Sequence, residues 1–295
     1  MGLMSLGLGL FVCISCAQKV EHKEDGTAFS HTNISSNIDA VSDSLYRVHI
    51  SNDDDDLFKD NSPKEDCPLC LLPMPFTTGV CGVRTTYMPC CGKMLCTGCS
   101  MAEHGEMEKG NIKPWCAFCR LPLPTSNKEA VKRIKKRMKL NDAHAYLQLG
   151  LLYERGDYGL TPNLNKAIEL WNKAAELGSS GAYYNLATAY HAGQGVEKDI
   201  EKAVHHYKLA AIGGHEQARH VLGAIEYSIG NMDTSMKHYM IAAKAGFDKS
   251  LKEVGEGFKD GCVTKDDYAN TLRAYQITVN DMKSVQRTTV KNNRD

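Results

Sequence analysis

The chain of 295 residues lacks the features that mark several broad classes of protein. No apolar run reaches the roughly 20 residues that a membrane-spanning helix needs, so the sequence predicts no membrane span. Its 35 basic residues balance its 35 acidic ones, which removes any overall charge that would attract a nucleic acid or a membrane surface. The sequence also has no His-Glu-x-x-His stretch, nucleophile elbow or phosphate-binding glycine loop. These absences argue against the metalloprotease, hydrolase and nucleotide-binding motifs that such stretches identify.

Charged side chains are absent from residues 1–17, which are rich in leucine. The small residues Ser15, Cys16 and Ala17 suit a signal-peptidase site, although the basic start of a typical signal peptide is missing. A myristoylation signal is excluded because Leu6 stands where Ser or Thr is required. We therefore interpret residues 1–17 as either a signal peptide or an apolar leader.

Residues 18–64 contain many acidic side chains and few apolar ones. This composition cannot bury a core and predicts an acidic disordered segment. The run Asp53–Asp56 lacks the alternating ligands and the glycine of a calcium-binding loop, so we interpret it as part of a solvated tail.

Cysteine is concentrated in one block, with nine of the 12 cysteines between Cys67 and Cys119. Such density indicates either disulfides in an oxidising compartment or metal ligands in a reducing one. Three pairs have two residues between their cysteines, a spacing that lets both sulfurs bind one tetrahedral ion: Cys67/Cys70, Cys96/Cys99 and Cys116/Cys119. A segment this short needs a metal or disulfides to fold by itself, and the repeated spacing favours metal.

The order of the cysteines resembles a RING finger, and the matching strings are Cys67-Pro-Leu-Cys70, Pro89-Cys90-Cys91-Gly92, Cys96-x-x-Cys99 and Cys116-x-x-Cys119-Arg120. The block is most similar to the all-cysteine RING variants, because Lys93 stands where most RING fingers have a histidine. The resemblance implies a zinc-stabilised α+β module at residues 65–125 with two structural zinc ions. By analogy with the RING cross-brace, the first ion would be held by Cys67, Cys70, Cys96 and Cys99, and the second by Cys90, Cys91, Cys116 and Cys119.

The second pair of ligands leaves alternatives open. Two adjacent ligands on one ion require a tight backbone turn, which Gly92 can supply. Cys81 and His104 are the other candidates to complete the second site. Thiolate sites without an open position would be structural, with no hydrolytic chemistry.

The RING resemblance also implies contacts with a ubiquitin-conjugating enzyme. Leu69, between the first two ligands, would be an apolar contact, and Arg120, after the eighth ligand, matches the position at which a guanidinium bonds the conjugating enzyme and ubiquitin together. Such a ligase forms no covalent intermediate, because it works by orienting the charged conjugating enzyme. Ala117 replaces the proline that usually follows the seventh ligand. The alternatives are a solvated cation for Arg120 and local packing for Leu69.

A repeat begins after the cysteine block, where proline nearly disappears. The pattern Ala-x-x-x-Leu-Gly starts at Ala145 and at Ala218, and the copy that starts at Ala182 has Ala187 in place of the glycine. A weaker fourth copy, Ser250-x-x-x-Val254-Gly255, follows, and the steps between the four are 37, 36 and 32 residues. Aromatic residues and glycines follow on the same period: Trp171, Tyr207, Tyr239 and Tyr275, and Gly178, Gly214 and Gly246. This period with two helical stretches in each unit predicts a helix-pair solenoid whose repeated aromatics lie in the core.

These repeats are similar to the Sel-1-like relatives of the tetratricopeptide family over residues 126–290, with a cap helix at the C-terminal end. The strings that carry the resemblance include Leu149-Gly150-x-x-Tyr153, Gly193-x-Gly195-Val196 and Lys173-Ala174-Ala175-x-x-Gly178. The resemblance implies adaptor or scaffold work, in which the repeat face binds a protein partner or substrate.

The repeats are preceded by a basic segment that contains Lys128, Lys132, Arg133, Lys135, Lys136, Arg137 and Lys139. Nuclear import or nucleic-acid contact is one interpretation. We favour an amphipathic helix whose apolar stripe is Val131, Ile134 and Met138, and we expect no nucleic-acid partner, since no aromatic residues are interleaved with the charges.

The sequence thus predicts a mostly α protein, with a small RING-like module before a helical solenoid. The first functional hypothesis is a RING-type ubiquitin ligase, or a subunit of one, that recruits its substrate through the repeats. The alternative is a zinc-stabilised scaffold without ligase activity. We expect a cytoplasmic or nuclear protein, or a protein of the secretory pathway if residues 1–17 are cleaved, in which case a disulfide-linked protein is the third interpretation.

Overall fold

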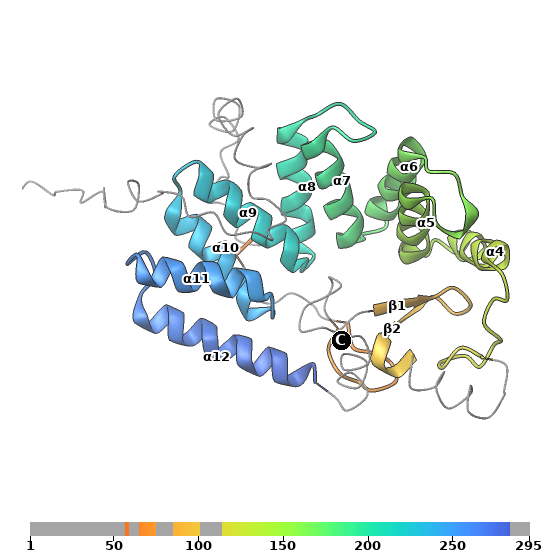
Figure 1. Cartoon of the computed structure of the whole chain (residues 1–295), viewed down its shortest axis with the longest axis horizontal. Coiled ribbons are helices and arrows are strands. Elements are labelled where there is room, and N and C mark those ends of the chain that lie inside the picture. The colour runs from red at the N-terminus through yellow and green to blue at the C-terminus, as the bar shows by residue number, and fades with distance from the viewer. Residues whose placement is uncertain (1–56, 59–64, 75–84, 101–113, 284–295) are drawn as a thin grey trace, which may run out of the picture. The chain divides into compact units, whose positions relative to one another are not determined.

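The structure, a computed structural model, describes residues 57–58, 65–74, 85–100 and 114–283 (Figure 1). The predicted leader, Cys81 and His104 lie outside these residues. Of the predicted acidic segment 18–64, only Leu57 and Phe58 are described, so disorder there stays a prediction. The described part of the chain is mostly helical, as the sequence predicts.

A continuous series of helices follows the cysteine block (Figure 1). They are α4 (Asn127–Met138), α5 (Ala143–Arg155), α6 (Leu164–Glu176), α7 (Ser180–Ala192), α8 (Ile200–Ile212), α9 (Glu216–Ser228), α10 (Met232–Lys244), α11 (Asp248–Lys259) and α12 (Lys265–Asp281). A short 3₁₀ helix, Asp157–Gly159, connects α5 and α6.

Local sequence sets where these helices begin and end. Asn163 caps α6 and Asp199 caps α8, because each side-chain oxygen accepts a hydrogen bond of 2.9 Å from the backbone N–H three residues later. After the second helix of each pair, Gly178, Gly214 and Gly246 adopt φ angles of 84°, 87° and 101°. Glycine adopts this left-handed conformation without the strain that a Cβ would cause, so the repeated glycine ends the helix.

The repeated small and apolar residues form the core, as predicted. Leu149, Leu186, Leu222 and Val254 are all at most 2% exposed, and the aromatics Trp171, Tyr207 and Tyr239 are buried as well. Tyr275, the fourth aromatic, is only half-buried because the last helix, α12, buries only Thr271. This agrees with a polar cap at the end of a solenoid.

Glycine at two repeat positions allows an aromatic ring to come close to the helix backbone. A Cβ atom at Gly150 would lie 2.4 Å from Nε1 of Trp171, and one at Gly223 would lie 2.7 Å from Cε1 of Tyr239. In the pairs α5–α6 and α9–α10 the aromatic of the second helix therefore packs directly on the glycine of the first helix, whereas α7 has Ala187 at this position. The Leu-Gly pair and the later aromatic are parts of one packing unit.

Helix α4 is amphipathic. Val131 and Ile134 are buried and Met138 is half-buried, while the lysines of the helix are exposed. The expected apolar stripe is therefore confirmed, and the positive charges are carried on the opposite side. Among the described residues, no helix has the length and apolar character needed to cross a membrane.

The cysteine block contains a two-stranded antiparallel sheet. Strand β1 (Thr85–Met88) pairs with β2 (Lys93–Cys96), and Thr85 lies opposite Cys96 while Met88 lies opposite Lys93. This register leaves residues 89–92 as the connecting turn. The hairpin thus carries the cysteines of its turn at one end and Cys96 at the other.

Candidate metal centre

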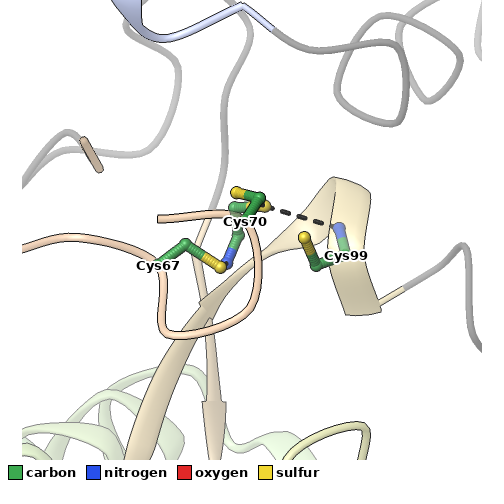
Figure 2. A group of neighbouring side chains, drawn as sticks. Cys67, Cys70 and Cys99 are labelled. Carbon is green, nitrogen blue, oxygen red and sulfur yellow. Dashed lines mark hydrogen bonds between the residues drawn. The ribbon is translucent and has the colours of Figure 1, made fainter. Parts of the chain in front are cut away.

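The first cysteine pair lies in a compact turn. The N–H of Leu71 donates to the carbonyl of Cys67 at 2.8 Å, and the N–H of Cys67 donates to the carbonyl of Leu72 at 3.0 Å. Leu71 has a φ of 55°, a left-handed conformation that is uncommon for a residue other than glycine. The turn places the side chains of Cys67 and Cys70 on the same side of the loop (Figure 2).

The last cysteine pair has the same local structure. The N–H of Arg120 donates to the carbonyl of Cys116 at 2.9 Å, and the N–H of Cys116 donates to the carbonyl of Leu121 at 2.7 Å. Arg120, with a φ of 62°, is the counterpart of Leu71. A shared pattern, Cys-x-x-Cys-x-Leu-Pro-x-Pro, begins at Cys67 and at Cys116 and underlies this equivalence. Our sequence reasoning missed this pattern, which identifies two copies of one ligand-bearing turn.

The two inner pairs come from the hairpin. In the turn between the strands, the N–H of Gly92 donates to the carbonyl of Met88 at 2.8 Å, and Gly92 has a φ of 74°. This is the tight turn that adjacent ligands at Cys90 and Cys91 require. At the other end, Cys96 closes β2, and Cys99 follows on the short helical stretch of residues 97–100 (Figure 2).

The eight predicted ligands come together as two groups of four. The first group is Cys67, Cys70, Cys96 and Cys99, and the second is Cys90, Cys91, Cys116 and Cys119. Within each group the sulfur atoms all lie within 4.8 Å of one another. The grouping pairs the first cysteine pair with the third, and the second pair with the fourth. Either tetrad could hold a metal ion.

Distances between sulfurs fit a tetrahedral ion. The Cys70 and Cys96 sulfurs are 3.9 Å apart, and so are those of Cys91 and Cys116. Four sulfurs at about 2.3 Å from a zinc ion form a tetrahedron with edges of about 3.8 Å. No disulfide joins any of the described cysteines, so the close approach of the sulfurs is not that of a covalent bond.

Electrostatics of the thiols also bear on metal binding. A hydrogen bond with the thiol of Cys96 lowers the pKa of Cys67 to about 4, whereas burial raises the pKa of Cys91 to about 11 and that of Cys99 to about 12. Several thiolates this close repel one another, so a cluster without a cation keeps protons on most of its sulfurs. A divalent cation would remove that repulsion, and an all-sulfur tetrahedral set is typical of structural zinc.

The two ligand-bearing turns display apolar side chains. Leu69 and Phe118 occupy equivalent positions within their turns and are 37% and 42% exposed. Arg120 is exposed, with its guanidinium carbon 5.8 Å from the centre of the Trp115 ring. Lys93 is exposed, outside both tetrads, with its ammonium 5.8 Å from the Phe118 ring. Ala117 is buried beside the seventh ligand.

Comparison with known proteins identifies the helical part of the chain. The Sel1 repeat family matches residues 143–179 and 180–215, which correspond to α5–α6 and α7–α8. The chain therefore carries Sel1 repeats, as the sequence predicts. The matched residues lie after the cysteine block.

Two curated proteins are similar to about half of this chain. Chitin synthase regulatory factor 4 of Schizosaccharomyces pombe is 27% identical over 133 residues, which are 45% of this chain and 21% of that protein. Putative sel1-like repeat-containing protein L21 of Acanthamoeba polyphaga mimivirus is 29% identical over 146 residues, which are 47% of this chain and 26% of that protein. The similarity thus spans about a quarter of the length of these relatives.

Among solved structures, a Sel1 repeat protein from Oxalobacter formigenes is similar at 25% sequence identity, with a TM-score of 0.46. The similarity covers 61% of this chain and 71% of that one.

Proposed function

We propose that this protein is a zinc-stabilised scaffold, in which a RING-type module at residues 65–125 is joined to Sel1 repeats that bind a protein partner. The alternation of the two cysteine tetrads carries this proposal. The first tetrad uses cysteine pairs one and three, and the second uses pairs two and four. Two isolated zinc sites would use neighbouring pairs, whereas a RING cross-brace needs this interleaved order.

Zinc in the proposed module is structural. All four positions of each tetrad are protein sulfurs, so no position stays open for water or substrate. Structural zinc contributes on the order of 10 kcal/mol to the folding of small finger domains. The described part of the module has only a hairpin of two four-residue strands, a short helical stretch at residues 97–100 and two ligand-bearing turns, so this contribution would account for its stability.

The Sel1 repeats supply the partner-binding part. Repeats of this kind present the side chains of successive helices on one extended surface, which suits recognition of another protein. The partner would be a protein segment held across several helices.

Ubiquitin ligation is the second candidate function, and the exposed face of the ligand-bearing turns favours it. Leu69 and Phe118 are large apolar side chains held in solvent by equivalent turns, and Arg120 lies beside the eighth ligand. An apolar contact next to a guanidinium suits a ubiquitin-conjugating enzyme charged with ubiquitin. Arg120 would orient that pair for attack by a substrate lysine, while no covalent intermediate forms on this chain.

Metal analysis of the reduced, full-length protein tests the scaffold. We expect two zinc ions per chain by mass spectrometry under native conditions. A chain that folds with no metal and with disulfides between these cysteines would overturn the proposal.

An autoubiquitination assay with a panel of conjugating enzymes separates the two functions. Activity that falls at least tenfold in Arg120→Ala, but not in the matched surface variant Lys136→Ala, supports ligation. No activity with any conjugating enzyme, by a protein that retains two zinc ions, leaves the scaffold as the function.

A further inference from the structure

Leu57 is fully buried, although it comes from the acidic segment that precedes the cysteine block. It belongs to a cluster of small and aromatic side chains in the middle of the repeats, which includes Ala187 of α7, Val204 and Tyr207 of α8, and Leu222 of α9. Complete burial of a leucine removes its apolar surface from water, which favours this contact. The helices of the repeats therefore bury a side chain that comes from outside the repeats.

The backbone beside Leu57 is also recognised. Arg219 of α9 is 3% exposed, and its guanidinium donates to the carbonyl of Leu57 and, at 2.9 Å, to the carbonyl of Ala211. A buried guanidinium that bonds a main-chain carbonyl recognises the backbone of its ligand as well as its side chain. This bond would be kept by any segment that places a carbonyl at the same point.

Phe58 lies against the next helix. Its ring centroid is 5.0 Å from that of His238 on α10, and the ammonium of Lys237 is 6.0 Å from the Phe58 ring. Leu57 and Phe58 thus engage α8, α9 and α10 with two adjacent side chains. We call these two residues the strap, and the surface formed by Val204, Leu222, Arg219, Lys237 and His238 the strap site.

The strap leaves polar groups of the site unsatisfied. His238 is 0% exposed, and neither of its ring nitrogens has a hydrogen-bond partner among the described residues. Burial, together with the positive charges of Arg219 and Lys208, lowers the pKa of His238 to about 3, so the ring stays neutral. Burial of a polar group without a hydrogen-bond partner is unfavourable. A ligand that also bonds His238 would therefore fit the site better than the strap does.

The charges around the strap site, and those next to the strap in the sequence, indicate the composition of such a ligand. The four residues before Leu57 in the sequence are Asp53–Asp56. Arg219, Lys208 and Lys237 come from α9, α8 and α10, the helices that hold the strap, and the charge of Lys208 also acts on the buried Glu226 of α9. An acidic run joined to a Leu-Phe pair is complementary to an apolar seat among cationic side chains.

We infer that the strap site is a binding site for a short segment of a partner protein, in which adjacent leucine and phenylalanine follow acidic residues, and that the chain's own strap occupies it in the absence of the partner. The inference rests on the proposed scaffold function and names the surface and the ligand of its repeats. A tethered occupant acts at an effective concentration of about a millimolar. The partner segment must displace it, so the strap reduces the apparent affinity of the site.

Direct binding of a probe peptide tests this inference. The probe is a fluorescein-labelled peptide of residues 50–61, and its fluorescence anisotropy is measured with the full-length protein and with the variant Leu57→Ser/Phe58→Ser. We expect the variant to bind the probe at least tenfold more tightly than the wild-type protein, because its site is vacant. The matched control is Leu140→Ser/Ile277→Ser, which removes two exposed apolar side chains elsewhere and should bind the probe as the wild type does.

Two further measurements keep the test decisive. A probe peptide with serine in place of both Leu57 and Phe58 should not bind to either protein. Circular dichroism must show that the protein variant Leu57→Ser/Phe58→Ser keeps its helices. If the double variant unfolds, Phe58→Ala replaces it in the same comparison. Equal affinity of the wild-type protein and a folded strap variant, or binding of the serine peptide, would overturn the inference. If that happens in a protein that still holds two zinc ions and still binds a partner, the proposed function stands.

Discussion

The sulfur atoms of Cys90 and Cys119 lie 3.5 Å apart, although 29 residues separate them in the sequence. Cys70 and Cys96, at 3.9 Å, bridge a similar interval in the other tetrad. The interval 70–96 and the interval 90–119 overlap at residues 90–96, which belong to the hairpin. A metal ion at either site would therefore restrain the same hairpin. A cross-brace of this kind links the two ligand-bearing turns through one hairpin.

Loss of one predicted ligand should remove one metal ion. We expect Cys91→Ser to bind about one zinc ion instead of two, because three sulfurs and a hydroxyl form a much weaker tetrahedral site. The matched control is Cys262→Ser, since Cys262 lies on neither tetrad. Native mass spectrometry gives the stoichiometry. A Cys91→Ser protein that keeps two tightly bound ions would return Cys81 and His104 as ligands of the second site.

Chelation should unfold the module and spare the repeats. Metal binding and folding are coupled in small zinc domains, whereas the repeats are stabilised by their own buried leucines and aromatics. Hydrogen exchange measured by mass spectrometry should show loss of protection in β1 and β2 with a strong chelator, and retained protection in α6 to α9. Unchanged protection of the hairpin after metal removal would contradict a structural role for zinc.

Much of the solenoid could be predicted from the sequence because its packing is local and repeated. Leu149, Leu186 and Leu222 recur on a fixed period, and each lies in the same kind of contact. Tyr275 departs from the pattern because, among the described residues, no later helix packs over α12. A period in the sequence predicts burial only where a neighbour exists on both sides.

The grouping of the eight cysteines into two tetrads was implied by the resemblance to a RING finger, while the two-residue spacing and the turn at Gly92 are local signals. Metal binding by these tetrads stays a prediction. The strap could not be found in this way. Leu57 stands in an acidic segment with no periodicity, and its seat is formed by residues more than a hundred positions later. A contact of that range leaves no local signal, so Leu57 was indistinguishable from the rest of residues 18–64.

Glycine at the aromatic contact should be required for stability. We expect Gly150→Ala to lower the free energy of unfolding by about 1–3 kcal/mol, because its Cβ would lie 2.4 Å from Nε1 of Trp171 and must displace the ring. The matched control is Gly255→Ala, at the same position of the last repeat, where the nearest atom is 3.9 Å away. There alanine should raise stability by up to about 1 kcal/mol, since it favours the helix. Urea unfolding, followed by circular dichroism, gives the free energy of unfolding of both variants. An unchanged stability of Gly150→Ala would contradict the direct packing of Trp171 on Gly150.

Buried histidines should make the fold sensitive to mild acid. Burial lowers the pKa of His215 and of His238 to about 3, below the value of about 6.5 in the unfolded chain. Between these values the unfolded state takes up protons that the folded state does not, so stability falls as the pH decreases below about 6.5. The slope is up to about 1.4 kcal/mol for each histidine and pH unit.

Replacing one of these rings separates its contribution from that of the carboxylates. We expect His238→Leu to reduce the loss of stability between pH 6.5 and pH 4.5, because leucine fills the site beside Phe58 without a titrating group. Urea midpoints at a series of pH values give the slope for each protein. His205→Leu, on the more exposed part of α8, is the matched control and should keep the wild-type slope. If His238→Leu and the wild type lose the same amount of stability between pH 6.5 and pH 4.5, the imidazole of His238 does not stay neutral in the folded protein. The argument that the strap site contains a neutral, unpaired histidine then fails.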